Sequence, residues 1–144
     1  MAGGETRLHL TRTFPAPREK VFRAWTDPAE LKKWFGPEGY STPIAEVDLR
    51  VGGQYRLGMM KLPDGQALYV VGTYREIRPP EKLVYTWRWE ATPELGETLV
   101  TVEFHDRGGS TEVSLTHELF PTDKARSDHE KGWSSILSQL TNAL

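Results

Sequence analysis

The chain has 144 residues, with 18 Lys or Arg, 20 Asp or Glu and no cysteine. Without cysteine, disulfides, thiolate nucleophiles and cysteine-based metal or iron–sulfur sites are excluded. A nearly balanced charge with no Lys/Arg cluster argues against nucleic acid and membrane surfaces as partners. The length is usual for one domain, so residues 1–144 are predicted to form a single domain. No signal peptide or membrane-spanning run is evident, and we expect a cytoplasmic protein.

The N-terminal quarter predicts one strand and two short helices. Alternating apolar residues predict a strand over 6–14, and apolar residues at helical spacing predict a helix over 18–26. Asp27-Pro28 is typical of a helix start, with Glu30 placed for a capping box. Gly36-Pro37 ends this second helix.

Between residues 44 and 120 the apolar pattern has a period of two and is interrupted by turn signals. These signals are Gly52-Gly53, Pro63-Asp64-Gly65, Pro79-Pro80 and Arg107-Gly108-Gly109. The connections are too short for a crossover, so we predict a six-stranded antiparallel meander.

Turns of two, two and four residues predict the strand register. The predicted pairs are Met59 with Leu68, Leu57 with Val70, Tyr55 with Gly72, Tyr74 with Tyr85, Gly72 with Trp87, Val70 with Trp89, Phe104 with Val113, Val102 with Leu115 and Val100 with His117. All three turns place these residues on one apolar face. The opposite, polar face carries Gln54, Arg56, Arg75, Lys82, Arg88, Glu103 and Glu112.

The C-terminal segment, residues 122–144, predicts a long amphipathic helix. Its apolar stripe contains Trp133, Ile136, Leu137, Leu140 and Leu144, and His129 extends the stripe by one turn. This helix is expected to cover the apolar face of the sheet.

Several short motifs resemble one family. They are Phe14-Pro15-Ala16-Pro17, Val21-Phe22-Arg23-Ala24-Trp25-Thr26-Asp27-Pro28, Trp34-Phe35-Gly36-Pro37, Asp48-Leu49-Arg50-Val51-Gly52-Gly53, Gly72-Thr73-Tyr74, Tyr85-Thr86-Trp87 and Gly132-Trp133. Together they resemble the domain related to activators of heat-shock-protein-90 ATPase, in the START-like and birch-pollen-allergen-like (SRPBCC) superfamily. The resemblance implies an α+β helix-grip fold of β-α-α-β6-α order. In that fold a curved antiparallel sheet wraps around the long C-terminal helix, and two short helices lie at one end.

Two of the four histidines are expected to face the interior. His9 and His105 alternate with apolar neighbours and should be solvated, whereas His117 and His129 belong to the inward face and stripe. These two could be structural histidines with satisfied hydrogen bonds. Alternatively, they could orient a ligand or move a proton. No third ligand is evident, so no metal is predicted.

Other positions also allow two interpretations. Asp48 and Arg50 project to the same side, and an ion pair at the following turn is favoured over a ligand anchor. Gly72, inside a strand, could be covered by an aromatic ring or could leave a notch for a ligand. Gly132, inside the final helix, raises the same question: it could leave space for a ligand or could allow the helix close to the sheet.

The resemblance implies a cavity between sheet and long helix that is used for hydrophobic ligands. We therefore predict a binding protein for a hydrophobic or aromatic small molecule, with no catalytic residue, metal or cofactor. The candidate ligand-binding residues are Trp25, Trp34, Phe35, Tyr55, Gly72, Tyr74, Trp87, Phe104, His117, His129 and Trp133. Two alternatives stay open, a polyketide aromatase/cyclase-like enzyme and a co-chaperone-type interaction module. Homodimer formation is a further hypothesis.

Overall fold

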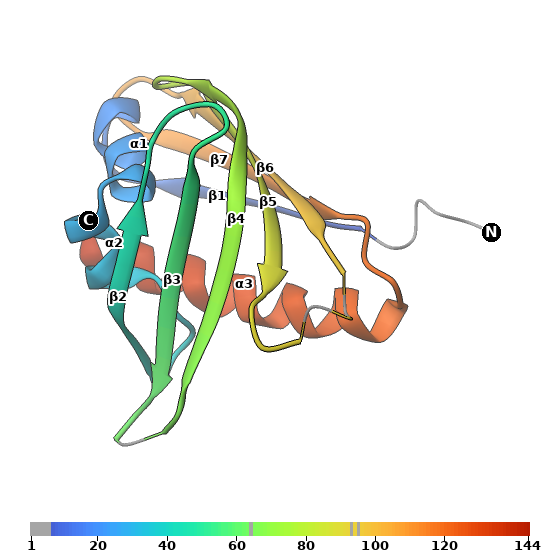
Figure 1. The fold of residues 1–144 in the computed structure, drawn as a ribbon. Coiled ribbons are helices and arrows are strands. Elements are labelled where there is room, and N and C mark those ends of the chain that lie inside the picture. The colour runs from blue at the N-terminus through green and yellow to red at the C-terminus, as the bar shows by residue number, and fades with distance from the viewer. Residues whose placement is uncertain (1–6, 64, 93, 95) are drawn as a thin grey trace.

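The computed structural model describes residues 7–63, 65–92, 94 and 96–144 (Figure 1). Position 6 of the first predicted strand lies outside these ranges. The elements confirm the predicted α+β order: β1 (Leu8–Phe14), α1 (Arg18–Thr26), α2 (Pro28–Trp34), β2 (Tyr40–Val47), β3 (Gln54–Lys61), β4 (Ala67–Arg78), β5 (Lys82–Trp89), β6 (Thr98–Asp106), β7 (Thr111–Glu118) and α3 (Asp123–Ala143).

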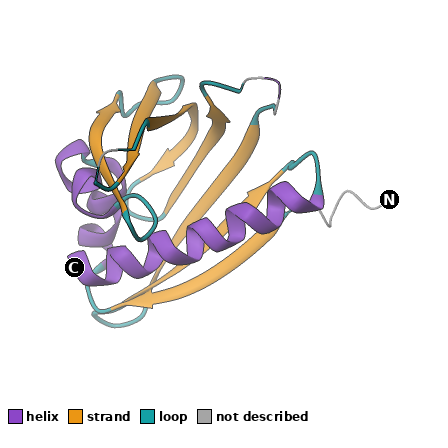
Figure 2. Ribbon diagram, turned by 90° about the horizontal axis from the view of Figure 1, so that it is seen from below, coloured by secondary structure: helices purple, strands orange, loops and turns teal. Residues whose placement is uncertain are grey.

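One antiparallel sheet contains all seven of these strands, in the order β1-β7-β6-β5-β4-β3-β2. The sheet curves around α3, which lies across its concave face (Figures 1 and 2). Helices α1 and α2 lie beside the C-terminal end of α3. This arrangement is the helix-grip fold that the resemblance implied.

The predicted registers are confirmed. The β4–β5 register is correct although the length of its turn differs from the prediction. Tyr55 pairs with Gly72, and Phe104 pairs with Val113. Tyr74 pairs with Tyr85, but Arg78 pairs with Lys82, so the β4–β5 turn has three residues rather than two. A register shift between Tyr74 and Glu76 compensates for the extra turn residue. Val71 pairs with Arg88 and Tyr74 pairs with Tyr85, so Gly72 lies opposite Trp87, as predicted.

Strand β2 begins at Tyr40, four residues before the predicted start of the meander. Pro43 interrupts the alternation of apolar and polar residues there, so the sequence pattern does not indicate a strand. The strand accommodates this proline because it lies at the edge of the sheet and its register shifts between Ser41 and Ile44. The β2 segment also contacts α2, since the Thr42 hydroxyl donates to the Phe35 carbonyl.

Helix α2 starts as predicted but without the capping box. The Asp27 carboxylate accepts a hydrogen bond from the Ala29 amide at 2.9 Å. The Asp27 amide is already bonded to the Arg23 carbonyl at 2.9 Å, so it is not available to Glu30. Glu30 instead pairs with Lys33 at 3.1 Å.

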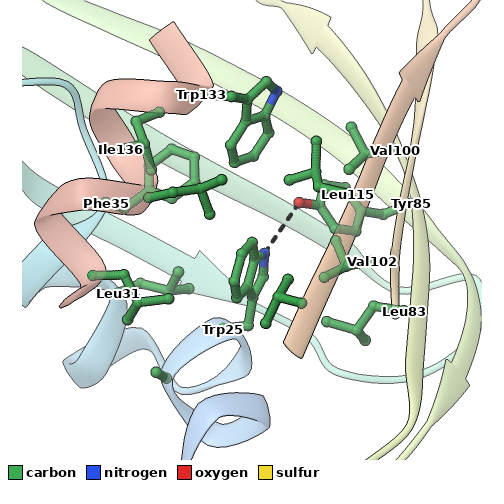
Figure 3. Close-up of a cluster of buried hydrophobic side chains, with 14 of the residues drawn as sticks. Trp25, Leu31, Phe35, Leu83, Tyr85, Val100, Val102, Leu115, Trp133 and Ile136 are labelled. Carbon is green, nitrogen blue, oxygen red and sulfur yellow. Dashed lines mark hydrogen bonds between the residues drawn. The ribbon is translucent and has the colours of Figure 1, made fainter. Parts of the chain in front are cut away.

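The buried apolar side chains form one cluster between the sheet and the three helices. Figure 3 shows its centre, where Trp25 of α1 points toward β5 and donates a hydrogen bond to the Tyr85 hydroxyl at 3.3 Å. Phe35 and Trp133 meet in this cluster with ring centres 5.9 Å apart. The aromatic residues therefore connect the two short helices to α3.

Candidate functional site

An apolar cleft of about 220 Å³ lies between α3, the strands β3 to β5 and the segment that joins α2 to β2. Its walls are formed by Pro37, Tyr40, Met59, Leu68, Trp87, Trp89, Asp128, His129, Gly132, Trp133 and Ile136. Leu68 is 46% exposed, although it is a large apolar residue. Apolar walls with a few polar groups are typical of small-molecule sites.

Gly132 makes room in this cleft. A Cβ atom at Gly132 would have no heavy atom of the described residues within 4 Å, apart from its chain neighbours and its own helix backbone. Of the two interpretations of Gly132, the one in which it lets the helix approach the sheet closely is therefore wrong. Its missing side chain leaves open space beside Trp133.

A second space, lined mainly by buried core residues, is much smaller. It has a volume of about 20 Å³ and is lined by Trp25, Leu31, Phe35, Val47, Tyr55, Leu57, Tyr74, Tyr85 and Trp87. This volume is enough for about one water molecule and not for a ligand. Trp87 contributes to the walls of both spaces.

Gly72 does not open a notch for a ligand, and that hypothesis is wrong. A Cβ atom at Gly72 would lie 2.6 Å from a ring carbon of Tyr55 and would also collide with the Thr86 carbonyl oxygen. The Tyr55 hydroxyl donates to that same carbonyl at 2.5 Å, which holds the ring over the glycine. The alternative interpretation, an aromatic ring that covers the gap, is correct.

A larger hollow of about 500 Å³ lies on the polar face of the sheet. Its lining includes Asp48, Glu97 and the ion pair between Arg56 and Glu90, whose atoms are 2.9 Å apart. Asp48 also pairs with Arg50 at 2.9 Å, as predicted. Charged walls are unsuited to an apolar ligand, so this hollow is not the candidate site.

His117 is fully buried, and both of its ring nitrogens are hydrogen-bonded. Trp133 Nε1 donates to His117 Nδ1 at 3.0 Å, while His117 Nε2 lies 2.6 Å from Thr98 Oγ1. Because an indole nitrogen can only donate, Nδ1 must be the acceptor and Nε2 must carry the proton. Thr98 in turn donates to the Trp87 carbonyl at 3.0 Å. His117 is thus neutral, with no free lone pair.

His129 has the opposite tautomer and lies at the edge of the cleft. Trp89 Nε1 donates to His129 Nε2 at 3.1 Å, and His129 Nδ1 lies 2.7 Å from the Ala125 carbonyl oxygen. Nε2 therefore accepts, and Nδ1 carries the proton. The two imidazoles form one aromatic group with Phe120, their ring centres 5.3 Å apart.

Burial keeps both imidazoles neutral. Removal from water lowers the pKa of His117 well below its usual value, and the nearby His129 lowers it further. Burial also lowers the pKa of His129, against an opposing effect of its bond to Ala125. With both nitrogens of each ring engaged in hydrogen bonds, neither imidazole has a lone pair available for proton transfer.

The buried His117 should make stability depend on pH. Below about pH 6.5 the unfolded chain binds a proton that the native His117 excludes, so the free energy of unfolding should decrease as the pH falls. This group can contribute at most about 1.4 kcal/mol per pH unit. Urea titrations between pH 7.5 and 4.5 should show a steeper decrease for wild type than for His117→Gln, which cannot titrate. Equal slopes would contradict a neutral, buried His117.

The remaining predicted site residues lie in the core. Trp34 donates to the Ala24 carbonyl at 2.9 Å, and Phe104 packs against Phe22 with ring centres 5.3 Å apart. Neither of these two residues lines the cleft. Three of the predicted site residues do line it: Trp87, His129 and Trp133. Four others line the small inner space instead: Trp25, Phe35, Tyr55 and Tyr74.

Sequence reasoning missed much of the cleft wall: Pro37, Tyr40, Met59, Leu68, Trp89, Asp128, Gly132 and Ile136 were not among the candidates. Trp89 and Ile136 could have been included, because the predicted register and helical stripe placed them inward. No local pattern indicated that the chain after α2 brings Pro37 and Tyr40 to the same place.

In the described ranges, no group of three His, Asp or Glu side chains could hold a metal ion. None of the helices in those ranges combines the length and the apolar character needed to cross a membrane.

A profile described as "Activator of Hsp90 ATPase homolog 1-like protein" (AHSA1) matches residues 15–144. The chain belongs to this family. The AHSA1-like family has the fold described above, and its fold commonly binds hydrophobic ligands. No curated protein matches the chain.

Solved structures agree with the AHSA1-like assignment. A protein from Chromobacterium violaceum is 31% identical, with a TM-score of 0.86 over 95% of this chain and 95% of that chain. An AHSA1 protein from Silicibacter pomeroyi is 29% identical, with a TM-score of 0.83 over 94% and 95% of the two chains. An HSP90 activator from Plasmodium falciparum is 27% identical, with a TM-score of 0.71 over 94% and 93%.

Proposed function

We propose that this chain binds a hydrophobic or aromatic small molecule in the cleft between α3 and the sheet. The observation that carries the proposal is the apolar cleft itself, with the open space that Gly132 leaves beside Trp133. Burial of apolar surface supplies the binding free energy, at about 25 cal/mol per Å². A cytoplasmic location and homodimer formation are further hypotheses, on which the proposal does not depend.

The cleft volume limits the size of the ligand. A closed cavity of about 150 Å³ holds benzene, so a cleft of about 220 Å³ suits a molecule of one or two rings or a short acyl chain. Larger ligands would require Leu68 and Trp89, on the sheet side of the cleft, to move apart from α3.

Naphthalene is a suitable first probe. We expect saturable binding of one naphthalene per chain. Tryptophan emission should detect this binding, because Trp87, Trp89 and Trp133 line the cleft. Salt should have little effect, since the binding free energy comes from apolar contact rather than charge. A linear, non-saturating response up to the solubility limit of naphthalene would contradict the proposal.

The aromatase/cyclase alternative gains no support from the site. Its proton carriers would be His117, His129 or a tyrosine, and both histidines use both nitrogens in hydrogen bonds. Burial raises the pKa of Tyr74 and Tyr85, which disfavours their ionised form.

A chaperone-related interaction is the second alternative, and one observation favours it: the similar protein from Plasmodium falciparum is an HSP90 activator. An interaction module requires no saturable internal site for small molecules. The naphthalene titration therefore separates the two functions, and absence of binding would move the preference to this alternative.

A further inference from the structure

Trp87 differs from the other tryptophans in its hydrogen bonding. The sequence has five tryptophans, and the indole N–H groups of the other four all donate to a partner: Trp25 to the Tyr85 hydroxyl, Trp34 to the Ala24 carbonyl, Trp89 to His129 and Trp133 to His117. Trp87 Nε1 is buried, and no atom of the described residues accepts its proton. A buried donor without a partner is unfavourable, because it has lost its hydrogen bond to water.

Trp87 lies where a ligand can meet this donor. Its ring contributes to the wall of the cleft and to the wall of the inner space. Its neighbours are aromatic rings, with the centres of Trp133 and His117 at 5.2 and 5.4 Å. Because no atom of the described residues accepts the Trp87 N–H proton, this N–H can bond to a molecule in the cleft without breaking a hydrogen bond.

The remaining polar groups of the cleft make a charged ligand unfavourable. Among the described residues, those that line the cleft include no Lys or Arg, and His129 is neutral with both nitrogens engaged. The one carboxylate in the wall, Asp128, pairs with Lys124 at 2.9 Å. A ligand carboxylate would therefore lose its hydration without gaining a cationic partner.

We propose that the ligand class is uncharged and mainly apolar, with one hydrogen-bond acceptor such as a carbonyl oxygen, and that Trp87 Nε1–H donates to this acceptor. This inference rests on the proposed function, because it names the kind of molecule that the cleft takes. The acceptor supplies the partner that the Trp87 indole lacks in the free protein. Trp87 is then the residue that selects among apolar molecules of the same shape.

Three naphthalene derivatives test the proposal by calorimetric titration. 2-Acetylnaphthalene carries a carbonyl, 2-isopropenylnaphthalene has nearly the same shape without an acceptor, and 2-naphthoate carries a charge. We expect the ketone to bind about tenfold more tightly than the alkene, and naphthoate to bind more weakly than either. In Trp87→Phe the preference of the ketone over the alkene should disappear.

Trp89→Phe is the matched control. It removes a cleft indole whose N–H is already bonded to His129, so affinities should decrease while the ketone keeps its preference. Loss of the preference in both variants would overturn the assignment to Trp87.

A measurement on wild type does not depend on whether Trp87→Phe folds. In a ¹H–¹⁵N spectrum with assigned indole resonances, the ketone should move the Trp87 Nε1–H signal downfield, and the alkene should not. If ketone and alkene bind equally, or if naphthoate binds as tightly as the ketone, this inference is overturned and the cleft remains a hydrophobic site. If none of the neutral probes binds, the proposed function itself fails.

Discussion

Gly72→Ala is expected to lower the free energy of unfolding by about 3 kcal/mol, the upper part of the usual range for overpacking. The added Cβ would meet the Thr86 carbonyl oxygen of the neighbouring strand and the ring of Tyr55. Neither can yield easily, because the Tyr55 hydroxyl is bonded to that carbonyl at 2.5 Å. Urea unfolding followed by far-UV circular dichroism measures the effect.

Gly132→Ala is the matched control, since it makes the same chemical change in open space. Alanine is a better helix former than glycine, so this variant should raise the free energy of unfolding by about 1 kcal/mol. We therefore expect Gly72→Ala to lower the free energy of unfolding and Gly132→Ala to raise it. If Gly72→Ala were as stable as wild type, the description of Gly72 as a covered glycine would be wrong.

Gly132→Leu is expected to lower naphthalene affinity by at least about tenfold while the protein stays folded. The leucine side chain would occupy the open space beside Trp133 and compete with the ligand for the cleft. Leucine is also a better helix former than glycine, so the loss of binding should not come from unfolding. Fluorescence titration together with thermal unfolding of the same sample separates the two effects.

Ser134→Leu adds a similar side chain to an exposed position of the same helix. It should leave naphthalene binding unchanged, because Ser134 does not line the cleft. Unchanged affinity in Gly132→Leu would show that naphthalene binds elsewhere, and equal losses in both variants would indicate an effect on the helix rather than on the cleft.

Much of the fold was predictable because it depends on short-range patterns. Helical spacing and the cap at Asp27 located α1 and α2, and turn lengths located most of the registers. The pairing of Tyr74 with Tyr85 was also predicted, although the turn has three residues and a register shift restores the pairing. Local patterns failed at β2, where Pro43 breaks the alternation and only the position at the sheet edge makes a strand acceptable.

The sequence by itself determined which residues face inward, because the periods of strands and helices assign a side to each residue. It thereby placed His117, Trp87 and Trp133 between the sheet and the final helix. Only the tertiary structure decided which inward residues border open space, because that depends on neighbours far apart in the chain. Gly72 and Gly132 illustrate the difference: Tyr55 closes the space at Gly72, whereas no described residue outside its own helix lies within 4 Å of a Cβ built at Gly132. Hydrogen bonding has the same non-local origin. The sequence therefore could not indicate that Trp87, among five tryptophans, keeps an N–H that no atom of the described residues accepts.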